Sequence, residues 1–482
     1  MTGTASVLVA SNRGPVSFAV GADGGLVATR GAGGLVSGLA AATRKGEALW
    51  VCAALSEADR RAARGAPQGR LDAGGHDTGG SAVRMLEIDP VTFYRAYNDV
   101  ANRTLWFISH LLYNTPLRPV FGSVFRREWA CYVDYDTAFA DALAEEAAPA
   151  ASVIVQDYHL SLTPRLLRAR RPDLRIGHFS HTPWAPPDYF RLLPDDVARD
   201  LLLGVLGADA AGFLTRRWAD AFGACCADTL DADYDGQAVT HEGRRTAVRV
   251  HPLGVDADEL RERAAQPDVA QRRAVLQENV RGRALVVRVD RTELSKNITR
   301  GLLAYRDLLR DHPEWHGRVV HLAQAYPSRH DLPEYREYTA EVQRVAHEVN
   351  DEFASPGWIP LVLSVDDDYA RSLAAMQLAD VLVVNPVRDG MNLVAKEGPV
   401  LSERGLGLVL SREAGAVAEL GEHAFVVNPY DVTGTAAAVH AALLQPAAER
   451  RRRTAALAAT AAALPPRQWL ADQLAGLATG AV

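Results

Sequence analysis

Residues 389–397 combine residue types that can bind a phosphate and a sugar. They follow the apolar run 381–384, which predicts a buried strand, and they open a stretch with a helical pattern. A strand that delivers a carboxylate and a glycine to a helix N-terminus is a common phosphate site in α/β proteins. Backbone N–H groups at 390–392 would face an anion, and Asp389 would bind sugar hydroxyls. Glu397, one turn further along, would accept from a ribose diol. The segment predicts a nucleotide-sugar site, although an ordinary capped turn explains it equally well in isolation.

A second charged group follows the apolar run at residues 285–289. Arg291 and Lys296 stand five positions apart and precede a helical pattern at residues 299–310. Two cations on a strand-to-helix loop can clamp a pyrophosphate and stabilise it as a leaving group without a metal. In isolation the segment also fits a solvated loop with scattered charges.

Polar side chains follow the apolar runs of the first half as well. Arg13 follows the run at residues 6–10, where an arginine can make a bidentate contact to a phosphate. Asp157 and His181 each follow a further apolar run, where a carboxylate and an imidazole can bind hydroxyls or transfer protons. Taken singly, Arg13 is more often a surface ion-pair residue, and Asp157 and His181 are better explained as capped loop residues.

Glycines, aromatics and one more arginine complete the candidate set. The segment around Gly33 and Gly34 lacks the spacing of a dinucleotide fingerprint, but it lets backbone approach a ligand closely. Tyr97 and Trp106 are expected to form one wall of a sugar pocket, although such aromatics also serve as core residues. Arg329 is expected to reach an acceptor phosphate.

The elements that position these residues are short apolar runs alternating with helical stretches, which predicts parallel sheets with helical crossovers. Two series of runs predict an α/β protein with two Rossmann-like, doubly wound parallel-sheet domains. A Pro/Gly break near residue 252 separates an N-terminal domain, 1–252, from a C-terminal domain, 253–455. Residues 456–482 are expected to form a C-terminal helix that packs back on the first domain. The expected strands cover residues 6–10, 153–155, 175–179, 210–213, 285–289, 319–323, 381–384, 407–410 and 424–427.

Composition argues against several classes of protein. The 482 residues carry a net charge of −7, so no basic field favours nucleic acid or an anionic membrane surface. No apolar run reaches the roughly 20 residues that span a bilayer, and the N-terminus shows no signal-peptide pattern. We therefore expect a cytoplasmic protein. The 4 cysteines form no C-x-x-C pair, which predicts packing thiols rather than disulfides or a zinc site.

Taken together, these segments resemble the trehalose-6-phosphate synthases, which are retaining glycosyltransferases of family 20. Those enzymes have the GT-B architecture, in which two Rossmann-like domains face a central cleft. The similar motifs occur in order over nearly the whole chain and are most specific at residues 388–397. The other motifs lie at residues 11–13, 33–35, 105–106, 157–160, 181–183, 291–296 and 327–329.

The resemblance implies transfer of glucose from a nucleoside diphosphate to glucose 6-phosphate with retention, giving α,α-trehalose 6-phosphate. It implies front-face attack, in which the leaving phosphate oxygen takes the acceptor proton, and it implies no cofactor and no metal. The implied catalytic residues are Arg291, Lys296, Asp389, His181 and Asp157. The implied acceptor-binding residues are Arg13, Tyr97, Trp106, Asp157 and Arg329. The implied donor-binding residues are Gly33, Gly34, His181, Arg291, Lys296, Asp389, Gly390, Met391, Asn392, Leu393, Val394, Ala395, Lys396 and Glu397.

Three positions depart from the family pattern. Asn297 stands where the family usually has a glycine after the clamp lysine, and the segment around Trp50 lacks the usual second tryptophan. Asp366, Asp367 and Asp368 stand close to where many uridine-nucleotide-using relatives place an aromatic or apolar residue near the base. A carboxylate can accept two hydrogen bonds from guanine, whereas uracil offers no matching donor pair. These aspartates suggest GDP-glucose over UDP-glucose, unless they only cap the following helix.

Two other functions fit the same residues. One is a related transferase that joins a nucleotide-linked cyclitol to an aminocyclitol phosphate. The other is a catalytically silent sugar-phosphate sensor, which would be expected to lose the clamp formed by Arg291, Lys296 and Asp389. The expected partners are the two small-molecule substrates, and the sequence is compatible with a homo-oligomer and with a downstream trehalose-phosphate phosphatase.

Overall fold

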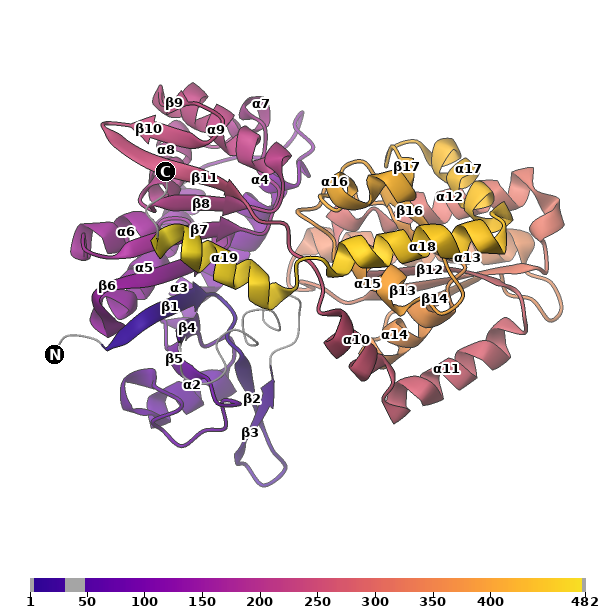
Figure 1. The fold of residues 1–482 in the computed structure, drawn as a ribbon, viewed down its shortest axis with the longest axis horizontal. Helices are drawn as coiled ribbons and strands as arrows, with labels where there is room; N and C mark the ends of the chain where they lie inside the picture. Colours follow the sequence, from indigo (N-terminus) through magenta and orange to yellow (C-terminus); the bar gives the residue numbers. More distant parts are fainter. Residues whose placement is uncertain (1–3, 31–47, 479–482) are drawn as a thin grey trace. The chain divides into compact units, whose positions relative to one another are not determined.

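The computed structural model describes residues 4–30 and 48–478, and the chain forms two compact units. Unit 1 comprises Met1–Leu253 and Pro466–Val482, and unit 2 comprises Gly254–Pro465 (Figure 1). The chain passes from one unit to the other close to the expected break at residue 252. It returns to unit 1 at residue 466 rather than 456, so residues 456–465 belong to unit 2.

Unit 1 is built on a sheet of nine strands in the described part of the chain, in the order β5-β4-β1-β6-β7-β8-β11-β10-β9. Strands β1, β4, β5, β6, β7 and β8, counted along the chain, take the order 3-2-1-4-5-6 of a Rossmann fold. β11 continues the parallel sheet, and β10 and β9 add an antiparallel edge. The strands are β1 Ala5–Ser11, β4 Leu49–Ala53, β5 Ala82–Leu86, β6 Ala147–Gln156, β7 Arg175–Ser180, β8 Ala210–Phe213, β9 Asp233–Tyr234, β10 Ala238–His241 and β11 Arg244–Val250.

The centre of this sheet is apolar because both faces are covered by helices. Leu8, Val9 and Ala10 of β1 have no exposed surface, and Leu8 pairs with Leu49 of β4 and with Val153 of β6. The helices of unit 1 are α2 Glu57–Gly65, α3 Pro90–Tyr94, α4 Trp106–Ser109, α5 Ser123–Glu146, α6 Thr163–Arg170, α7 Pro187–Phe190, α8 Asp195–Leu206, α9 Arg216–Leu230 and α19 Pro466–Ala478.

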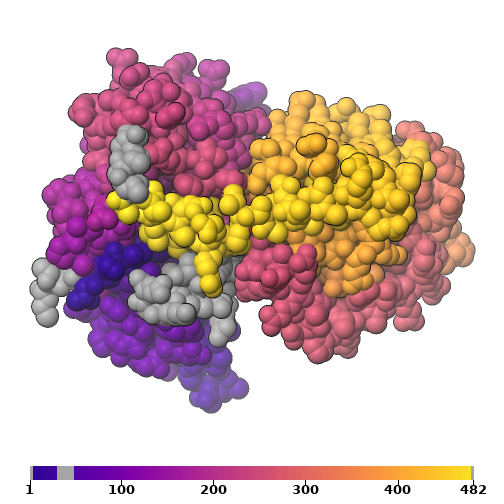
Figure 2. Space-filling model, viewed as in Figure 1, coloured from indigo at the N-terminus to yellow at the C-terminus, as the bar shows by residue number. Residues whose placement is uncertain are grey.

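The last helix, α19, lies against the sheet of unit 1. Leu477 packs close to the backbone of Gly177 on β7, and the ring of Trp469 meets Phe179 edge to face at 4.8 Å. The indole N–H of Trp469 donates to the carbonyl of His251 at 3.0 Å. Figure 2 shows α19 on the surface of unit 1 and the Arg-rich helix α18, Ala447–Ala462, on the surface of unit 2.

Unit 2 contains a parallel sheet of six strands within the described residues, in the order β14-β13-β12-β15-β16-β17. Counted along the chain, this order is again 3-2-1-4-5-6. The strands are β12 Ala284–Arg291, β13 Val319–Tyr326, β14 Leu361–Ser364, β15 Val381–Val384, β16 Gly407–Ser411 and β17 Phe425–Val427. Besides α18, the helices are α10 Ala257–Ala264, α11 Pro267–Val280, α12 Ile298–Asp311, α13 Pro333–Phe353, α14 Tyr369–Leu378, α15 Val394–Leu401, α16 Val417–Leu420 and α17 Val432–Leu444.

The predicted α/β class with two Rossmann-like sheets is confirmed, but the expected strand set was incomplete. β4 and β5 were missed, and so was the β2–β3 hairpin, Val16–Val20 paired with Leu26–Arg30. These strands are short and stand next to Gly-rich segments, so neither period nor length separates them from loop sequence. The antiparallel edge strands β9 and β10, the strand β11 beside them and the strand β14 of unit 2 were missed as well.

Two expectations from composition can be compared with the described structure. Its four cysteines are free thiols, with Cys52, Cys225 and Cys226 buried. In the same part of the chain, no helix is both long enough and apolar enough to cross a bilayer.

Candidate active site

The central switch point of unit 2 brings the two charged segments together. The strand order reverses between β12 and β15, and ligands of such sheets bind at the carboxyl ends of the strands beside that point. Arg291 ends β12 and is followed by a short 3₁₀ turn, Leu294–Lys296. Asp389 follows β15, so Lys296 and Asp389 meet because the strands before them are neighbours.

Lys296 and Asp389 form a close ion pair at this point. The ammonium nitrogen is 2.6 Å from Oδ2 of Asp389, and the side chains are only 13% and 14% exposed. Burial disfavours the charged ammonium, but neighbouring carboxylates, led by Asp389, outweigh it and raise the pKa of Lys296. Lys296 therefore stays charged and can stabilise negative charge on a ligand.

The loop after β15 holds Asp389 through the side chain of Asn392. The amide nitrogen of the Asn392 side chain donates to Oδ2 of Asp389 at 3.1 Å, and its amide oxygen accepts from the N–H of Ala395 at 3.2 Å. Asn392 has a φ of 77°, which asparagine tolerates better than most residues. Helix α15 begins only at Val394, so Gly390, Met391 and Asn392 lie in the loop that precedes the helix rather than in its first turn.

Among the implied donor-binding residues 393–397, some side chains are buried and others are partly exposed. The side chain of Lys396 is 0% exposed and pairs with Glu419 at 2.6 Å, and Ala395 is fully buried. Their side chains therefore hold the loop in place rather than face a ligand. Leu393, Val394 and Glu397 are partly exposed. Burial raises the pKa of Glu397 to about 7, so its ionisation falls in the physiological range.

Glu293, which no sequence motif singled out, lies in the chain between Arg291 and Lys296. Its side chain is fully buried, and Oε1 lies 3.1 Å from Arg291 and accepts from the hydroxyl of Ser328 at 2.9 Å. Oε2 is 3.9 Å from Arg329. Burial opposes ionisation, but the cations of Arg291 and Arg329 outweigh it and lower the pKa of Glu293 to about 2. The signal was present in the sequence, as a carboxylate placed between the two clamp cations.

The second residue held by Glu293, Arg329, is also fixed by its own segment. It has a φ of 47°, and its guanidinium donates to the hydroxyl of Tyr335 at 2.7 Å. The guanidinium also lies over the ring of Tyr335, 5.6 Å from its centre. The side chain of Arg329 is only 12% exposed. Glu293 and Tyr335 thus orient a cation that the sequence pattern assigned to an acceptor phosphate.

The switch point of unit 1, between β1 and β6, gathers a second set of polar residues. Arg13 follows β1, and Asp157 follows β6 with a φ of 73°. Arg13 donates to the hydroxyl of Tyr97 at 3.5 Å. The Tyr97 ring stacks on His159, with ring centres 5.5 Å apart. Oδ2 of Asp157 is 3.9 Å from Nδ1 of His159, so Arg13, Tyr97 and Asp157 belong to one group.

His181, at the end of β7, is joined to the same group through Asp157. Its backbone N–H donates to Oδ1 of Asp157 at 3.1 Å, and its Nε2 pairs with Oε1 of Gln156 at 2.7 Å. Because the amide oxygen is an acceptor, Nε2 carries the proton. Burial, and then the neighbouring His178, lower the pKa of His181 to about 3. His181 is therefore a neutral hydrogen-bonding group near neutral pH.

Trp106 is the implied acceptor residue that is most deeply packed in unit 1. It is 8% exposed, its ring stacks on His110 at 3.8 Å, and it lies 5.7 Å from the ring of Tyr158. Tyr97 lies on the π-helical stretch Arg95–Leu105 that leads directly into Trp106. Such stretches are rare and are often found at functional sites.

Two of the three departures from the family pattern, Asn297 and Trp50, are side chains that support the structure around them. Asn297 has a φ of 57°, a conformation that favours glycine, and its side chain donates to the carbonyls of Asn385 and Pro429 at 2.9 and 2.7 Å. Trp50 is fully buried in β4 and donates to the hydroxyl of Ser11 at 2.7 Å, so it supports β1. Gly33 and Gly34, which the resemblance implies as donor-binding residues, lie outside the residues that the structure describes.

The aspartates of the predicted base-selecting segment divide into two groups. Asp368 caps α14 by accepting from the N–H of Arg371 at 2.9 Å, and it pairs with Arg272 at 2.7 Å. Asp366 and Asp367 are exposed. The capping alternative therefore accounts for Asp368 but not for the other two.

Two Rossmann-like sheets, each with polar residues at its central switch point, define the GT-B class of glycosyltransferase folds. The model of glycosyltransferase family 20 matches residues 5–479. The chain therefore belongs to this family.

Individual relatives show how far the similarity extends. A probable alpha,alpha-trehalose-phosphate synthase [UDP-forming] of Arabidopsis thaliana is 32% identical over 455 residues, which cover 92% of this chain and 53% of the relative. A validamine 7-phosphate valienyltransferase of Streptomyces hygroscopicus is 33% identical over 452 residues, covering 92% and 88%. A solved E. coli structure, described as trehalose-6-phosphate bound with UDP-2-fluoro glucose, has a TM-score of 0.85 at 27% identity and covers 99% of each chain. The chain spans about half the length of several curated relatives that it matches.

Proposed function

We propose that this chain is a retaining glycosyltransferase that transfers glucose from a nucleoside diphosphate to glucose 6-phosphate, forming α,α-trehalose 6-phosphate. The observation that carries the proposal is the pairing of Lys296 with Asp389 at the switch point of unit 2, beside Arg291. This is a charged constellation in the position where a Rossmann-like sheet binds a nucleotide. The similarity to named trehalose-phosphate synthases supplies the sugars.

In this proposal, unit 2 binds the donor and stabilises the departing diphosphate. Lys296, kept charged by its carboxylate neighbours, and Arg291, oriented by Glu293, offset the negative charge that develops as the glycosidic bond breaks. Asp389 orients hydroxyls of the transferred sugar, and Glu397 accepts from the ribose. No carboxylate acts as a nucleophile.

Arg13, Tyr97, Trp106 and Asp157 of unit 1 are the proposed acceptor-binding residues, and Arg329 is a proposed binding residue for the acceptor phosphate. The acceptor hydroxyl attacks the anomeric carbon on the face that the diphosphate leaves. Its proton passes to the leaving phosphate oxygen, so the products are trehalose 6-phosphate and a nucleoside diphosphate. His181 stays neutral and contributes hydrogen bonding rather than proton transfer. Orientation of the two sugars supplies much of the rate enhancement.

For the donor base, two observations point in different directions. The similar synthases are named UDP-forming, as the A. thaliana relative is. Asp368 caps α14, whereas Asp366 and Asp367 are exposed. A carboxylate can accept from the paired N–H donors of guanine. We retain GDP-glucose as the proposed preferred donor on the second observation, and UDP-glucose is the direct competitor.

The proposal is tested by measuring diphosphate release from purified protein with glucose 6-phosphate and, separately, GDP-, UDP-, ADP- and TDP-glucose. The sugar product is identified by NMR. A non-reducing α,α-linked disaccharide phosphate is the expected product, and the fastest donor identifies the base. Nucleotide binding without turnover of any donor would contradict the proposal and favour a sugar-phosphate sensor.

A second candidate function is supported by the similarity to the valienyltransferase, of which this chain spans 88%. That reaction class joins a nucleotide-linked cyclitol to an aminocyclitol phosphate, using the same two kinds of subsite. Turnover only with a cyclitol donor, and none with glucose donors, would favour it. A downstream phosphatase remains a proposed partner, since one relative is named a bifunctional synthase/phosphatase.

A further inference from the structure

A separate group of three side chains lies at the other end of α12 from Lys296. His312 follows α12, Glu314 lies in the 3₁₀ turn Pro313–Trp315, and His440 lies on α17. α12 has 14 residues, so its two ends are about 21 Å apart at about 1.5 Å per residue. The group is therefore remote from the candidate active site, and nothing in the proposed reaction uses it.

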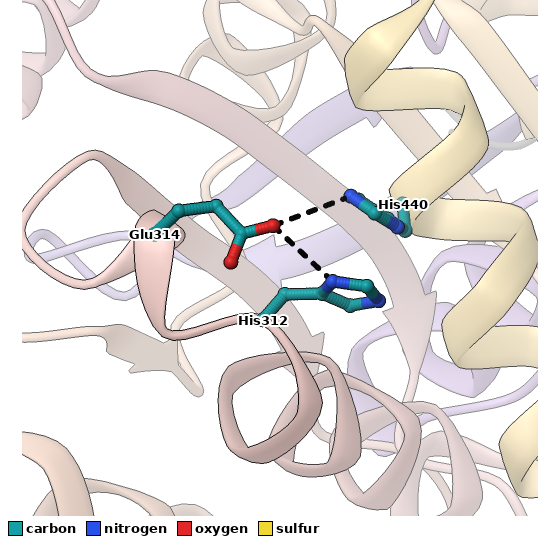
Figure 3. A group of neighbouring side chains, drawn as sticks. All are labelled: His312, Glu314 and His440. Atoms are coloured by element: carbon teal, nitrogen blue, oxygen red, sulfur yellow. Dashed lines mark hydrogen bonds and ion pairs between the residues drawn. The ribbon is translucent and has the colours of Figure 1, made fainter.

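The three side chains converge on one point. Nδ1 of His312 is 3.2 Å from Oε1 of Glu314, and Nε2 of His440 is 3.8 Å from the same oxygen (Figure 3). All three ligand atoms lie within 4.8 Å of one another. Zn²⁺ binds such atoms at about 2.1 Å, which places tetrahedral ligand atoms about 3.4 Å apart. The spacings of 3.2 and 3.8 Å bracket this value, so the ligand atoms already lie near the separations that an ion requires.

The chemistry of the donor set indicates which ions fit. Two imidazoles with one carboxylate suit Zn²⁺ and neighbouring transition metals, whereas Mg²⁺ and Ca²⁺ prefer oxygen ligands throughout. The side chains of His312, Glu314 and His440 are 32%, 54% and 19% exposed. An ion can therefore reach them from solvent, and water can fill the remaining positions.

The two imidazoles lie side by side before any ion binds. The ring centres of His312 and His440 are 3.5 Å apart. Neutral imidazole is the form that coordinates metals.

We propose that His312, Glu314 and His440 form a binding site for a divalent transition-metal ion, with Zn²⁺ as the expected occupant. The ion joins the end of α12 to α17, two helices that pack against each other in unit 2. Its role is structural. It fixes the far end of the helix that begins two residues after Lys296, and it takes no part in sugar transfer.

The test uses protein without a histidine tag, stripped of metal with a chelator and then dialysed. Zn²⁺ is titrated by calorimetry, and Co²⁺ is titrated by visible absorption, because its spectrum reports ligand type and geometry. Wild-type protein is expected to bind one ion per chain at this site. His312→Gln, Glu314→Gln and His440→Gln are each expected to weaken binding about tenfold or more. The double variant His312→Gln/His440→Gln is expected to lose the site.

His347→Gln is the matched control. His347 is an exposed histidine of α13 that pairs with Asp351 at 3.2 Å, but it has no third ligand of this kind beside it among the described residues. It should bind metal as wild type does. Circular dichroism and diphosphate release check that each variant is folded. Wild-type protein that binds neither ion, or a folded double variant that binds as tightly as wild type, would overturn the proposal.

Discussion

Lys296 and Asp389 are separated by 93 residues along the chain, yet their charged atoms lie 2.6 Å apart. They meet because β12 and β15 are neighbours at the reversal of strand order in unit 2. Both side chains are largely buried, and Asp389 is the leading cause of the raised pKa of Lys296. The pair is therefore the most direct place to test the proposed donor site.

Replacing Lys296 with alanine should lower kcat by about 100-fold or more, because a preorganised cation facing the departing diphosphate is lost. Asp389→Asn should have a comparable effect, and the double variant should lose less than the product of the two, since the residues act as a unit. Steady-state rates with saturating substrates measure this. Arg310→Ala is the control, since Arg310 forms an exposed pair with Glu352 at the other end of α12. Fully additive losses would contradict the coupling.

Glu293→Gln should reduce both stability and donor turnover. The carboxylate of Glu293 pairs with Arg291 and Arg329. Removing one partner of a buried ion pair lowers the free energy of unfolding by about 3 kcal/mol or more. Urea unfolding of the variant should show this loss. The lowered pKa means that the stabilisation by Glu293 is present above pH 4.5 and is lost as pH falls through about 2. A variant as stable and active as wild type at pH 7 would show that Glu293 positions neither arginine.

The pH dependence of donor binding should report Glu397. Its pKa is raised from the usual 4.5 to about 7, and the ribose needs the ionised form as acceptor. The KM for the donor should therefore rise as pH falls below about 7, and Glu397→Gln should remove this dependence. Folding stability should change in the opposite sense. The contribution of Glu397 is full below pH 4.5 and is lost as pH rises through about 7, because burial favours the protonated form. Identical pH profiles for wild type and variant would rule out this assignment.

Asn297 should be more favourable than either glycine or alanine. Asn297→Gly keeps the left-handed backbone but loses the side-chain bonds to Asn385 and Pro429, each worth about 1 kcal/mol. Asn297→Ala loses the same bonds and adds about 1 kcal/mol for the left-handed conformation. Denaturant unfolding should rank wild type above glycine and glycine above alanine. Equal stability of the two variants would show that the backbone conformation contributes little.

The exposed aspartates should decide the base preference if the GDP-glucose proposal holds. Asp366→Asn or Asp367→Asn should lower the ratio of kcat/KM for GDP-glucose to that for UDP-glucose by about tenfold or more, since hydrogen bonds to a charged acceptor are lost. Asp368→Asn is the matched control, because asparagine also caps a helix. An unchanged ratio in all three variants would remove the GDP proposal.

The sequence by itself determined the two-domain α/β class, since alternating apolar runs and helical stretches leave few other solutions. It also identified the segments that carry the candidate site, because strand ends in a parallel sheet are where polar residues gather. The hairpin and the short strands β4 and β5 escaped prediction, since short strands beside glycines have no distinctive period.

Only the tertiary structure decided which of these residues meet. The strand order puts Lys296 against Asp389, and Arg13 and Tyr97 in one group with Asp157, and no local pattern encodes that order. The packing of the chain also buries Lys396 against Glu419 and places Glu293 between two arginines. It thereby separates supporting side chains from those that can face a ligand. It also brings His440 to His312, because helix packing joins residues that are distant in the chain. Residue types are local, whereas burial and charge pairing arise only when distant segments pack together.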